Sequence, residues 1–169
     1  MNRKLGVVED TLYVPMLGRI YASENCRGVL YDKKALEFKK KLPKGMIEND
    51  TQTQYTYLAS ASRSANMDRY IADFIKRRPD GIVVQLGCGL ETTFYRCDNG
   101  RTKWYAIDLP NVIEYRQSFL PEAEREECIA GDAFGKGWIE QIRSVHSDDP
   151  LLITASGLFY YFEEEKVLG

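Results

Sequence analysis

Short apolar runs alternate with amphipathic segments along this chain. The run at residues 82–86 is bounded by Gly81 and Gly87 and contains one polar residue. A run of this kind is typical of a buried parallel strand, because both faces of a parallel sheet are covered. Three shorter or similar runs follow, at residues 103–107, 128–130 and 151–155. The pattern therefore predicts four strands.

Between the strands, apolar residues recur every three or four positions, which is the spacing of amphipathic helices. The expected helices are an N-terminal arm within residues 8–36 and segments at 55–78, 111–120 and 138–145. Strands that alternate with helices predict an α/β fold with a doubly wound, mainly parallel sheet. Within one structural domain, we expect residues 1–78 to form a helical arm and cap and residues 79–169 to form the sheet-containing core.

The turn after the first strand is suited to a nucleotide-like ligand. Gly87-Cys88-Gly89 lets the backbone approach a ligand where a Cβ would collide, and a polar helix start follows at residues 91–93. Thr92 occupies the place of the third glycine in the dinucleotide fingerprint. A pyrophosphate here would meet the carboxylate of Glu91, whereas S-adenosylmethionine has a ribose and an amino group but no phosphate. The turn favours S-adenosylmethionine, although two glycines alone are a weak signal.

Further candidate ligand-binding residues follow the other strands. Asp108 ends the second strand, roughly 20 residues after Gly89, the spacing at which an acid accepts hydrogen bonds from ribose hydroxyls. The alternative is a helix N-cap ahead of Pro110. Asp132 is placed to accept from the adenine amine, with Phe134 available to pack on the base. Ligands of such sheets bind at the carboxyl ends of the strands, where four candidates fall: Gly87, Asp108, Asp132 and Ser156.

Composition argues against several classes of function. Lys and Arg number 23 against 25 Asp and Glu, and the net charge of -2 leaves no basic footprint for nucleic acid. The sequence has no stretch of about 18 apolar residues and no signal peptide, so we expect a cytoplasmic protein without a membrane role. Its four cysteines form no CxxC pair. They predict free thiols and no metal site.

Five phrases of the sequence resemble the leucine carboxyl methyltransferase family, which includes bacterial O-methyltransferases of polyketide biosynthesis. They are DTLYVPMLGRIYAS, YLASASRS, QLGCGLETTFYR, WYAIDLP and ITASGLFYYF. The likeness runs from about Thr11 to Phe162 and implies the Rossmann-like class I methyltransferase fold. It also implies methyl transfer from S-adenosylmethionine to a carboxylate or hydroxyl oxygen. Because the family continues beyond residue 169, the resemblance implies a chain that is truncated at its C-terminus.

The resemblance assigns the first cofactor contacts by position. Arg63 would hold the methionine carboxylate of the cofactor. The turn Gly87, Cys88 and Gly89 would line its methionine part, and Asp108 would bind the ribose.

The remaining contacts come from the third and fourth strands. Asp132 and Ala133 would flank the adenine. Family members usually have a glutamate where this chain has Ser156, so the contact from the fourth strand departs from the pattern. Tyr161 is the candidate residue beside the transferred methyl group.

The acceptor is expected to be a carboxylate of a small molecule or of a peptide C-terminus, with a hydroxyl as the alternative. A carboxylate is already ionised at neutral pH and needs no general base. The only histidine, His146, is far in sequence from the strand ends. Two other readings stay open: a non-catalytic protein that binds S-adenosylmethionine or S-adenosylhomocysteine, and a nicotinamide-dependent oxidoreductase.

Overall fold

The chain forms two compact units, each of which is described by itself. The computed structural model describes residues 7–42, 51–121 and 123–168, with side chains from residue 12 onward. One unit comprises Met1–Tyr70 with Leu90–Asp98, and the other comprises Ile71–Gly89 with Asn99–Gly169. Parts of the expected arm, residues 1–6 and 43–50, lie outside the described residues. The functional division at residue 78 stays a prediction.

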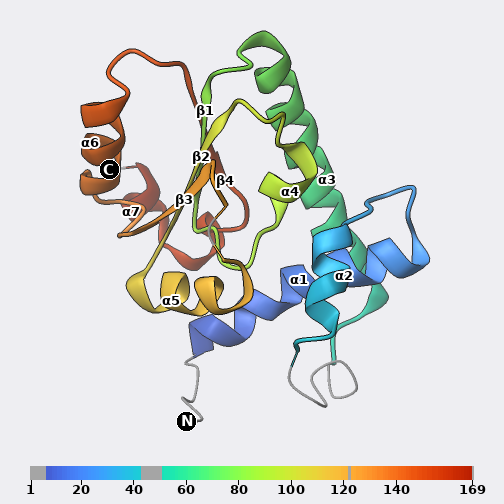
Figure 1. The fold of residues 1–169 in the computed structure, drawn as a ribbon. Helices are drawn as coiled ribbons and strands as arrows, with labels where there is room; N and C mark the ends of the chain where they lie inside the picture. The colour runs from blue at the N-terminus through green and yellow to red at the C-terminus, as the bar shows by residue number, and fades with distance from the viewer. Residues whose placement is uncertain (1–6, 43–50, 122, 169) are drawn as a thin grey trace. The chain divides into compact units, whose positions relative to one another are not determined.

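The second unit contains a four-stranded sheet in which all neighbouring strands are parallel (Figure 1). Its strands are β1 (Ile82–Leu86), β2 (Lys103–Asp108), β3 (Glu126–Ala130) and β4 (Leu151–Ala155), in the order β3-β2-β1-β4. All four predicted strands are confirmed, and β3 begins two residues earlier than expected. Strands β2 and β3 lie on one side of β1, and β4 lies on its other side. The carboxyl end of β1 is therefore at the switch point of a doubly wound sheet.

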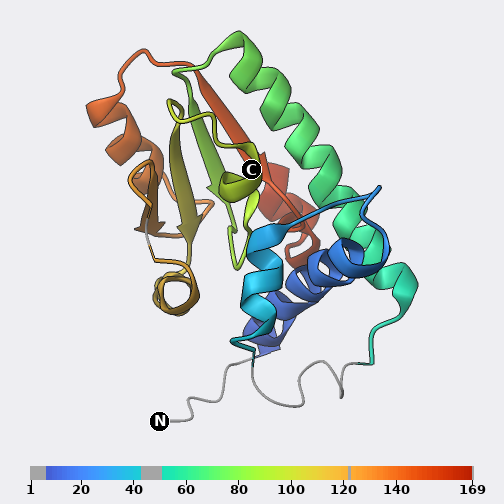
Figure 2. The ribbon, with the colours of Figure 1, turned by 45° about the vertical axis from the view of Figure 1, so that its right-hand side comes forward.

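Two helices cover opposite faces of this sheet. Helix α6 (Gly137–Val145) packs Trp138 and Ile142 into a core that includes Tyr105 of β2. Helix α5 (Pro110–Phe119) packs Ile113 against Ala106, the next residue along β2. Because successive side chains of a strand point to opposite faces, α5 and α6 lie on different sides of the sheet. The predicted doubly wound fold is therefore confirmed. Figure 2 shows the strands side by side, with α6 next to them.

A short segment follows the sheet in the second unit. After β4 the chain forms a 3-10 turn, η1 (Phe159–Tyr161), and helix α7 (Glu164–Leu168).

The first unit is helical. It contains α1 (Val7–Asn25), α2 (Lys33–Lys39), the N-terminal part of α3 (Gln54–Arg77) and α4 (Thr93–Cys97). Helices α1 and α3 approach closely at Gly18, where an added Cβ would lie 2.9 Å from the carbonyl oxygen of Tyr57. A small core of Ala22, Leu30 and Ala61 fills the space beside this contact. The segment in which an N-terminal helical arm was expected, residues 8–36, contains nearly all of α1 and most of α2.

Candidate functional site

The carboxyl ends of the four strands meet at one edge of the sheet. The Cys88 N–H donates to the carbonyl oxygen of Ile107 (3.1 Å), and the Gly131 N–H donates to that of Asp108 (2.9 Å). These bonds continue the parallel ladders past the ends of β1 and β3. The glycine turn, Asp108 and the loop after β3 therefore lie next to one another, as the sequence predicted.

The glycine turn requires its glycines. Gly87 has φ 60 and Gly89 has φ 45, both in the left-handed region that disfavours residues with a Cβ. A Cβ on Gly87 would also lie 2.8 Å from Cδ1 of Leu158. Leu158 follows Ser156 and Gly157 after β4, so the loops after β1 and β4 pack against each other here.

Asp108 is held at the end of β2 by two backbone donors. Its Oδ2 accepts from the Gly89 N–H and its Oδ1 from the Leu109 N–H, each at 2.8 Å. Burial raises the pKa of Asp108, and these two hydrogen bonds oppose the rise. Each carboxylate oxygen accepts two hydrogen bonds when ionised, so one position remains on each for a ligand hydroxyl. The alternative N-cap role is wrong, because Leu109 is the N-cap of α5.

The loop after β3 presents Asp132 and Ala133 beside an aromatic cluster. Asp132 is exposed, and its Oδ1 accepts from the Phe134 N–H at 3.0 Å. The Ala133 carbonyl oxygen accepts from the indole N–H of Trp138 at 3.2 Å. The ring of Phe134 meets Phe162 edge to face, with 4.7 Å between centroids. Phe134 is therefore engaged by the segment after β4.

The remaining second-unit candidates differ in exposure. Ser156 is half-buried directly after β4, whereas Tyr161 lies in η1 with 60% of its surface exposed. Cys88 is buried, and burial raises the pKa of its thiol far above the ordinary value, so the thiol stays neutral. All four cysteines are free.

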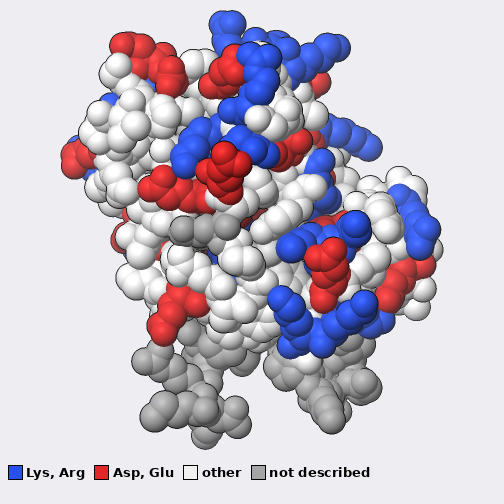
Figure 3. Space-filling model, viewed as in Figure 1, with Lys and Arg blue, Asp and Glu red and all other residues white. Residues whose placement is uncertain are grey.

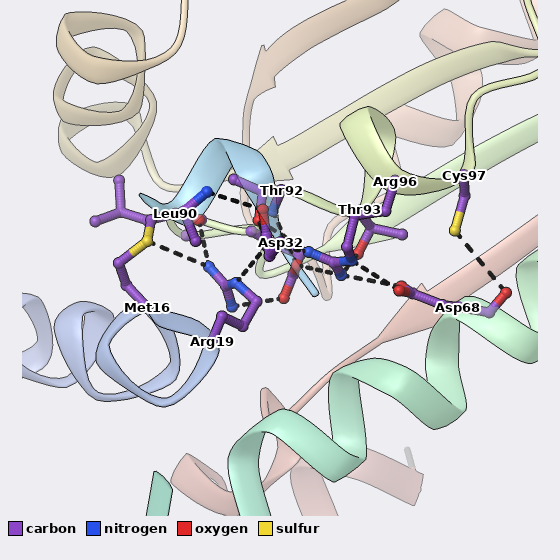
Figure 4. Close-up of polar contacts among 12 residues, drawn as sticks. Met16, Arg19, Asp32, Asp68, Leu90, Thr92, Thr93, Arg96 and Cys97 are labelled. Atoms are coloured by element: carbon purple, nitrogen blue, oxygen red, sulfur yellow. Dashed lines mark hydrogen bonds and ion pairs between the residues drawn. The ribbon is translucent and has the colours of Figure 1, made fainter. Parts of the chain in front are cut away.

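Glu91 is not available to a ligand in the way that the sequence suggested. In the first unit its carboxylate pairs with Arg19 (2.9 Å) and Arg96 (3.0 Å). Figure 4 shows these two arginines close to Asp32. Arg96 also binds Asp68 (2.7 Å), and Asp32 pairs with both arginines. Burial alone would raise the pKa of Glu91, but the two arginines outweigh burial and hold the pKa well below its usual range. Glu91 is therefore held in ion pairs with arginines that two other carboxylates share, and its expected repulsion of a pyrophosphate stays a prediction.

These five residues, Arg19, Asp32, Asp68, Glu91 and Arg96, are called the arginine cluster below. Sequence reasoning missed it because residues that pair in it are distant in sequence: Arg19 and Glu91 are 72 positions apart. One signal was present: Arg19 stands three residues after Met16, on the buried face of α1.

The helix after the glycine turn also differs from expectation. Helix α4 has only five residues, and its N-cap, Thr92, makes no capping bond with its side chain. The Thr92 N–H donates to Oε1 of Glu91, and the Thr92 hydroxyl donates to Asp32. This helix start is bound to the arginine cluster.

Arg63 lies on α3 in the first unit. It is half-buried, and its Nε is enclosed without a hydrogen-bond partner among the described residues. A planar guanidinium with an unused buried donor fits a carboxylate ligand.

His146 is at the C-terminal end of α6, which leads to the start of β4. Its ring lies between the Tyr105 hydroxyl (3.1 Å) and the Asp149 carboxylate (2.8 Å). In a parallel sheet the start of β4 lies at the edge opposite the strands' carboxyl ends. Within the described ranges, no group of three His, Cys, Asp or Glu side chains is placed to hold a metal ion.

Two comparisons with known proteins found similar sequences. The model of the family described as leucine carboxyl methyltransferase matches residues 6–168. The chain is also 28% identical over 162 residues to the tetracenomycin polyketide synthesis O-methyltransferase TcmP of Streptomyces glaucescens. That alignment covers 95% of this chain and 58% of TcmP, so the chain spans little more than half the length of this relative. Because the family model matches almost the whole chain, the chain belongs to the leucine carboxyl methyltransferase family.

Proposed function

We propose that this protein is an S-adenosylmethionine-dependent O-methyltransferase. The observation that supports it most is Asp108, whose two oxygens are aligned by the N–H groups of Gly89 and Leu109 while keeping an acceptor position each. The membership of the leucine carboxyl methyltransferase family and the name of its relative TcmP point to the same chemistry. When bound, S-adenosylmethionine would supply a methyl group on a sulfonium.

The chain's own residues would bind and orient the two reactants. Asp108 accepts from both ribose hydroxyls, and the turn at Gly87 to Gly89, whose glycines have no Cβ, lines the methionine part. Arg63 binds the methionine carboxylate through its unused Nε donor. In a displacement at carbon the protein mainly has to align the acceptor oxygen and exclude water, which requires positioning more than proton transfer.

The adenine end and the acceptor side complete the assignment. Asp132 and Ala133 flank the base, and Ser156 contacts the cofactor from the loop after β4. Tyr161 lines the side from which the acceptor approaches, and its exposure fits contact with a second substrate.

A carboxylate is the proposed acceptor. It is ionised at neutral pH without help. The chain's only histidine, His146, is engaged by Tyr105 and Asp149 at the end of α6 that leads to the start of β4. A hydroxyl acceptor is the second candidate, because TcmP is named as an O-methyltransferase of polyketide synthesis.

Calorimetry with S-adenosylhomocysteine tests the cofactor. We expect micromolar binding that Asp108→Asn weakens at least about tenfold, or roughly 1.4 kcal/mol, because the amide accepts fewer hydrogen bonds. Asp73→Asn is the matched control, since Asp73 is exposed on α3. NAD should not bind.

Equal affinity of the Asp108→Asn variant and the wild type would contradict the ribose assignment. Binding of NAD instead of S-adenosylhomocysteine would favour the oxidoreductase reading. Tight binding of S-adenosylhomocysteine with no methyl transfer to any acceptor would favour the non-catalytic reading.

A further inference from the structure

Both polar backbone groups of Gly89 are held by side chains. Its N–H donates to Oδ2 of Asp108 at 2.8 Å, and its carbonyl oxygen accepts from Nη1 of Arg116 at 3.1 Å. The two bonds belong to the two peptide groups on either side of the Gly89 Cα. Fixing both peptides restrains φ and ψ of a residue that, as a glycine, would otherwise move freely.

Asp108 and Arg116 come from one continuous segment. Asp108 ends β2, and Arg116 lies in α5, which begins at Pro110. The strand and the helix therefore each supply one side chain that binds the backbone of Gly89. The path of the glycine turn is set by this β2-α5 segment.

Arg116 is itself fixed by a buried carboxylate. Its Nη2 lies 2.8 Å from Oε1 of Glu126 at the start of β3, and the two side chains are 0% and 2% exposed. Glu126 neutralises the guanidinium and limits its rotation, because the planar fork can meet the carboxylate and the Gly89 carbonyl together in few orientations.

Stability alone gives this ion pair little reason to exist. Removing two charges from water is costly, and replacing a buried pair with apolar residues of similar volume is often neutral or stabilising. Apolar residues could not reproduce the hydrogen bond from Arg116 to the Gly89 carbonyl. That bond points to a role in the shape of the turn.

We infer that Arg116, oriented by Glu126, is a positioning residue that sets the glycine turn and so aligns Gly89 and Asp108 for the ribose of the cofactor. The inference rests on the proposed function for its ligand. The restraint on Gly89 itself follows from contacts within the second unit alone.

The test removes the pair as a whole, so that no buried charge is left alone. In Arg116→Met with Glu126→Met, both replacements are unbranched and apolar. We expect a thermal midpoint close to that of the wild type, but S-adenosylhomocysteine binding weakened at least about tenfold. Amide hydrogen exchange at Gly89 should become at least about tenfold faster, because its two restraints are coupled.

Arg143→Met is the matched control. Arg143 donates to the backbone carbonyls of His146, Ser147 and Asp149 in the same unit, but none of these belongs to the glycine turn. Its affinity and its Gly89 exchange should equal those of the wild type. Restored affinity in Arg116→Lys with Glu126 intact would also support positioning, since an ammonium can still donate to the Gly89 carbonyl.

The binding measurement tests the proposed function, and the hydrogen-exchange measurement tests the positioning role of Arg116. If the wild type does not bind S-adenosylhomocysteine, the proposed function fails, and Gly89 exchange still decides the positioning role. Unchanged exchange and affinity in the double variant would overturn the inference. If the double variant does not fold, Arg116→Leu with Glu126→Leu takes its place, because it also leaves no buried charge and no donor for the Gly89 carbonyl. Wild-type exchange at Gly89 in that variant would likewise overturn the inference.

Discussion

Gly87 and Asp108 are restrained by the backbone around them rather than by a partner side chain of opposite charge. Gly87 combines a left-handed φ with a close neighbour, Leu158. Asp108 takes two backbone N–H groups and keeps acceptor positions free. Gly87 needs the absence of a Cβ, and Asp108 needs two carboxylate oxygens, so neither residue can be replaced without changing these contacts. Substitutions there should affect the turn before they affect the fold.

Gly87→Ala separates the two restraints on the turn. A left-handed φ costs a residue with a Cβ about 1–2 kcal/mol, and overlap with Leu158 should add to that loss of unfolding free energy. Gly100→Ala is the control, since Gly100 has φ 79 and an added Cβ would meet no atom within 4 Å. Urea unfolding of both variants should show the larger loss for Gly87→Ala.

Gly87→Ala should lose more unfolding free energy than Gly100→Ala, and this excess is the cost of the overlap with Leu158. Adding Leu158→Ala to Gly87→Ala should restore only that excess. Equal losses for the two glycine variants would mean that Leu158 moves aside without cost.

At the scale of elements, the arginine cluster joins the helices of the first unit. Arg19 comes from α1, Asp68 from α3 and Arg96 from α4, while Asp32 is the N-cap of α2. Glu91 pairs with two of these residues directly before α4. Such a cluster stabilises the packing of helices only while its carboxylates are ionised, so it makes the unit sensitive to acid.

Acid should therefore destabilise the first unit through Glu91. The pKa of Glu91 is depressed in the folded state from an ordinary value of 4.5, so its contribution is present above pH 4.5 and is lost as the pH falls below it. Urea unfolding followed by circular dichroism at successive pH values should show that the free energy of unfolding falls below pH 4.5. In Glu91→Gln this component of the fall should be absent, and total stability at pH 7 should be lower by about 3 kcal/mol or more, because two buried arginines lose a partner.

Asp108 works in the opposite direction. Its pKa is raised, so its ionisation costs stability as the pH rises through the folded-state pKa. Asp108→Asn should leave the acid-induced loss from Glu91 in place. Identical pH profiles for the wild type and Glu91→Gln would contradict the assignment of the acid sensitivity to Glu91.

At the scale of the whole molecule, positive and negative charges nearly balance. The face in Figure 3 shows Lys and Arg interspersed with Asp and Glu, in keeping with a net charge of -2. Among the described helices, none combines the length and apolar character needed to cross a bilayer.

The type of bond formed to the acceptor distinguishes the two candidate activities. We expect methyl groups transferred from labelled S-adenosylmethionine to be released as volatile methanol on mild alkaline treatment, because carboxyl methyl esters hydrolyse and methyl ethers do not. Candidate acceptors should be offered in pairs that differ only in a carboxylate or a hydroxyl. Label that survives alkali would instead assign a hydroxyl acceptor, and Asp108→Asn should abolish either signal if the transfer is enzymatic.

The sequence by itself determined how strands and helices follow one another along the chain. It also determined the edge of the sheet at which the candidate ligand-binding residues lie. Local patterns suffice for this, because burial of one helix face or of both strand faces repeats along the chain. The residues of the glycine turn and Asp108 followed from that order, since parallel strands place their carboxyl ends together. The bounds of β4 were predicted to the residue.

Only the tertiary structure decided how the charged residues pair. Glu91 was considered only as a charge that a pyrophosphate would meet, but it pairs with Arg19, 72 positions away. Glu126 belonged to an acidic run that gave no sign of a buried partner, and Arg116 to an ordinary amphipathic helix, although it stands three and four residues after the buried Ile113 and Val112. A charge on an apolar face shows that a partner is needed, because burying it alone is costly. Which residue supplies that partner depends on contacts between segments that are distant in sequence, and hydrophobic periodicity contains no information about them.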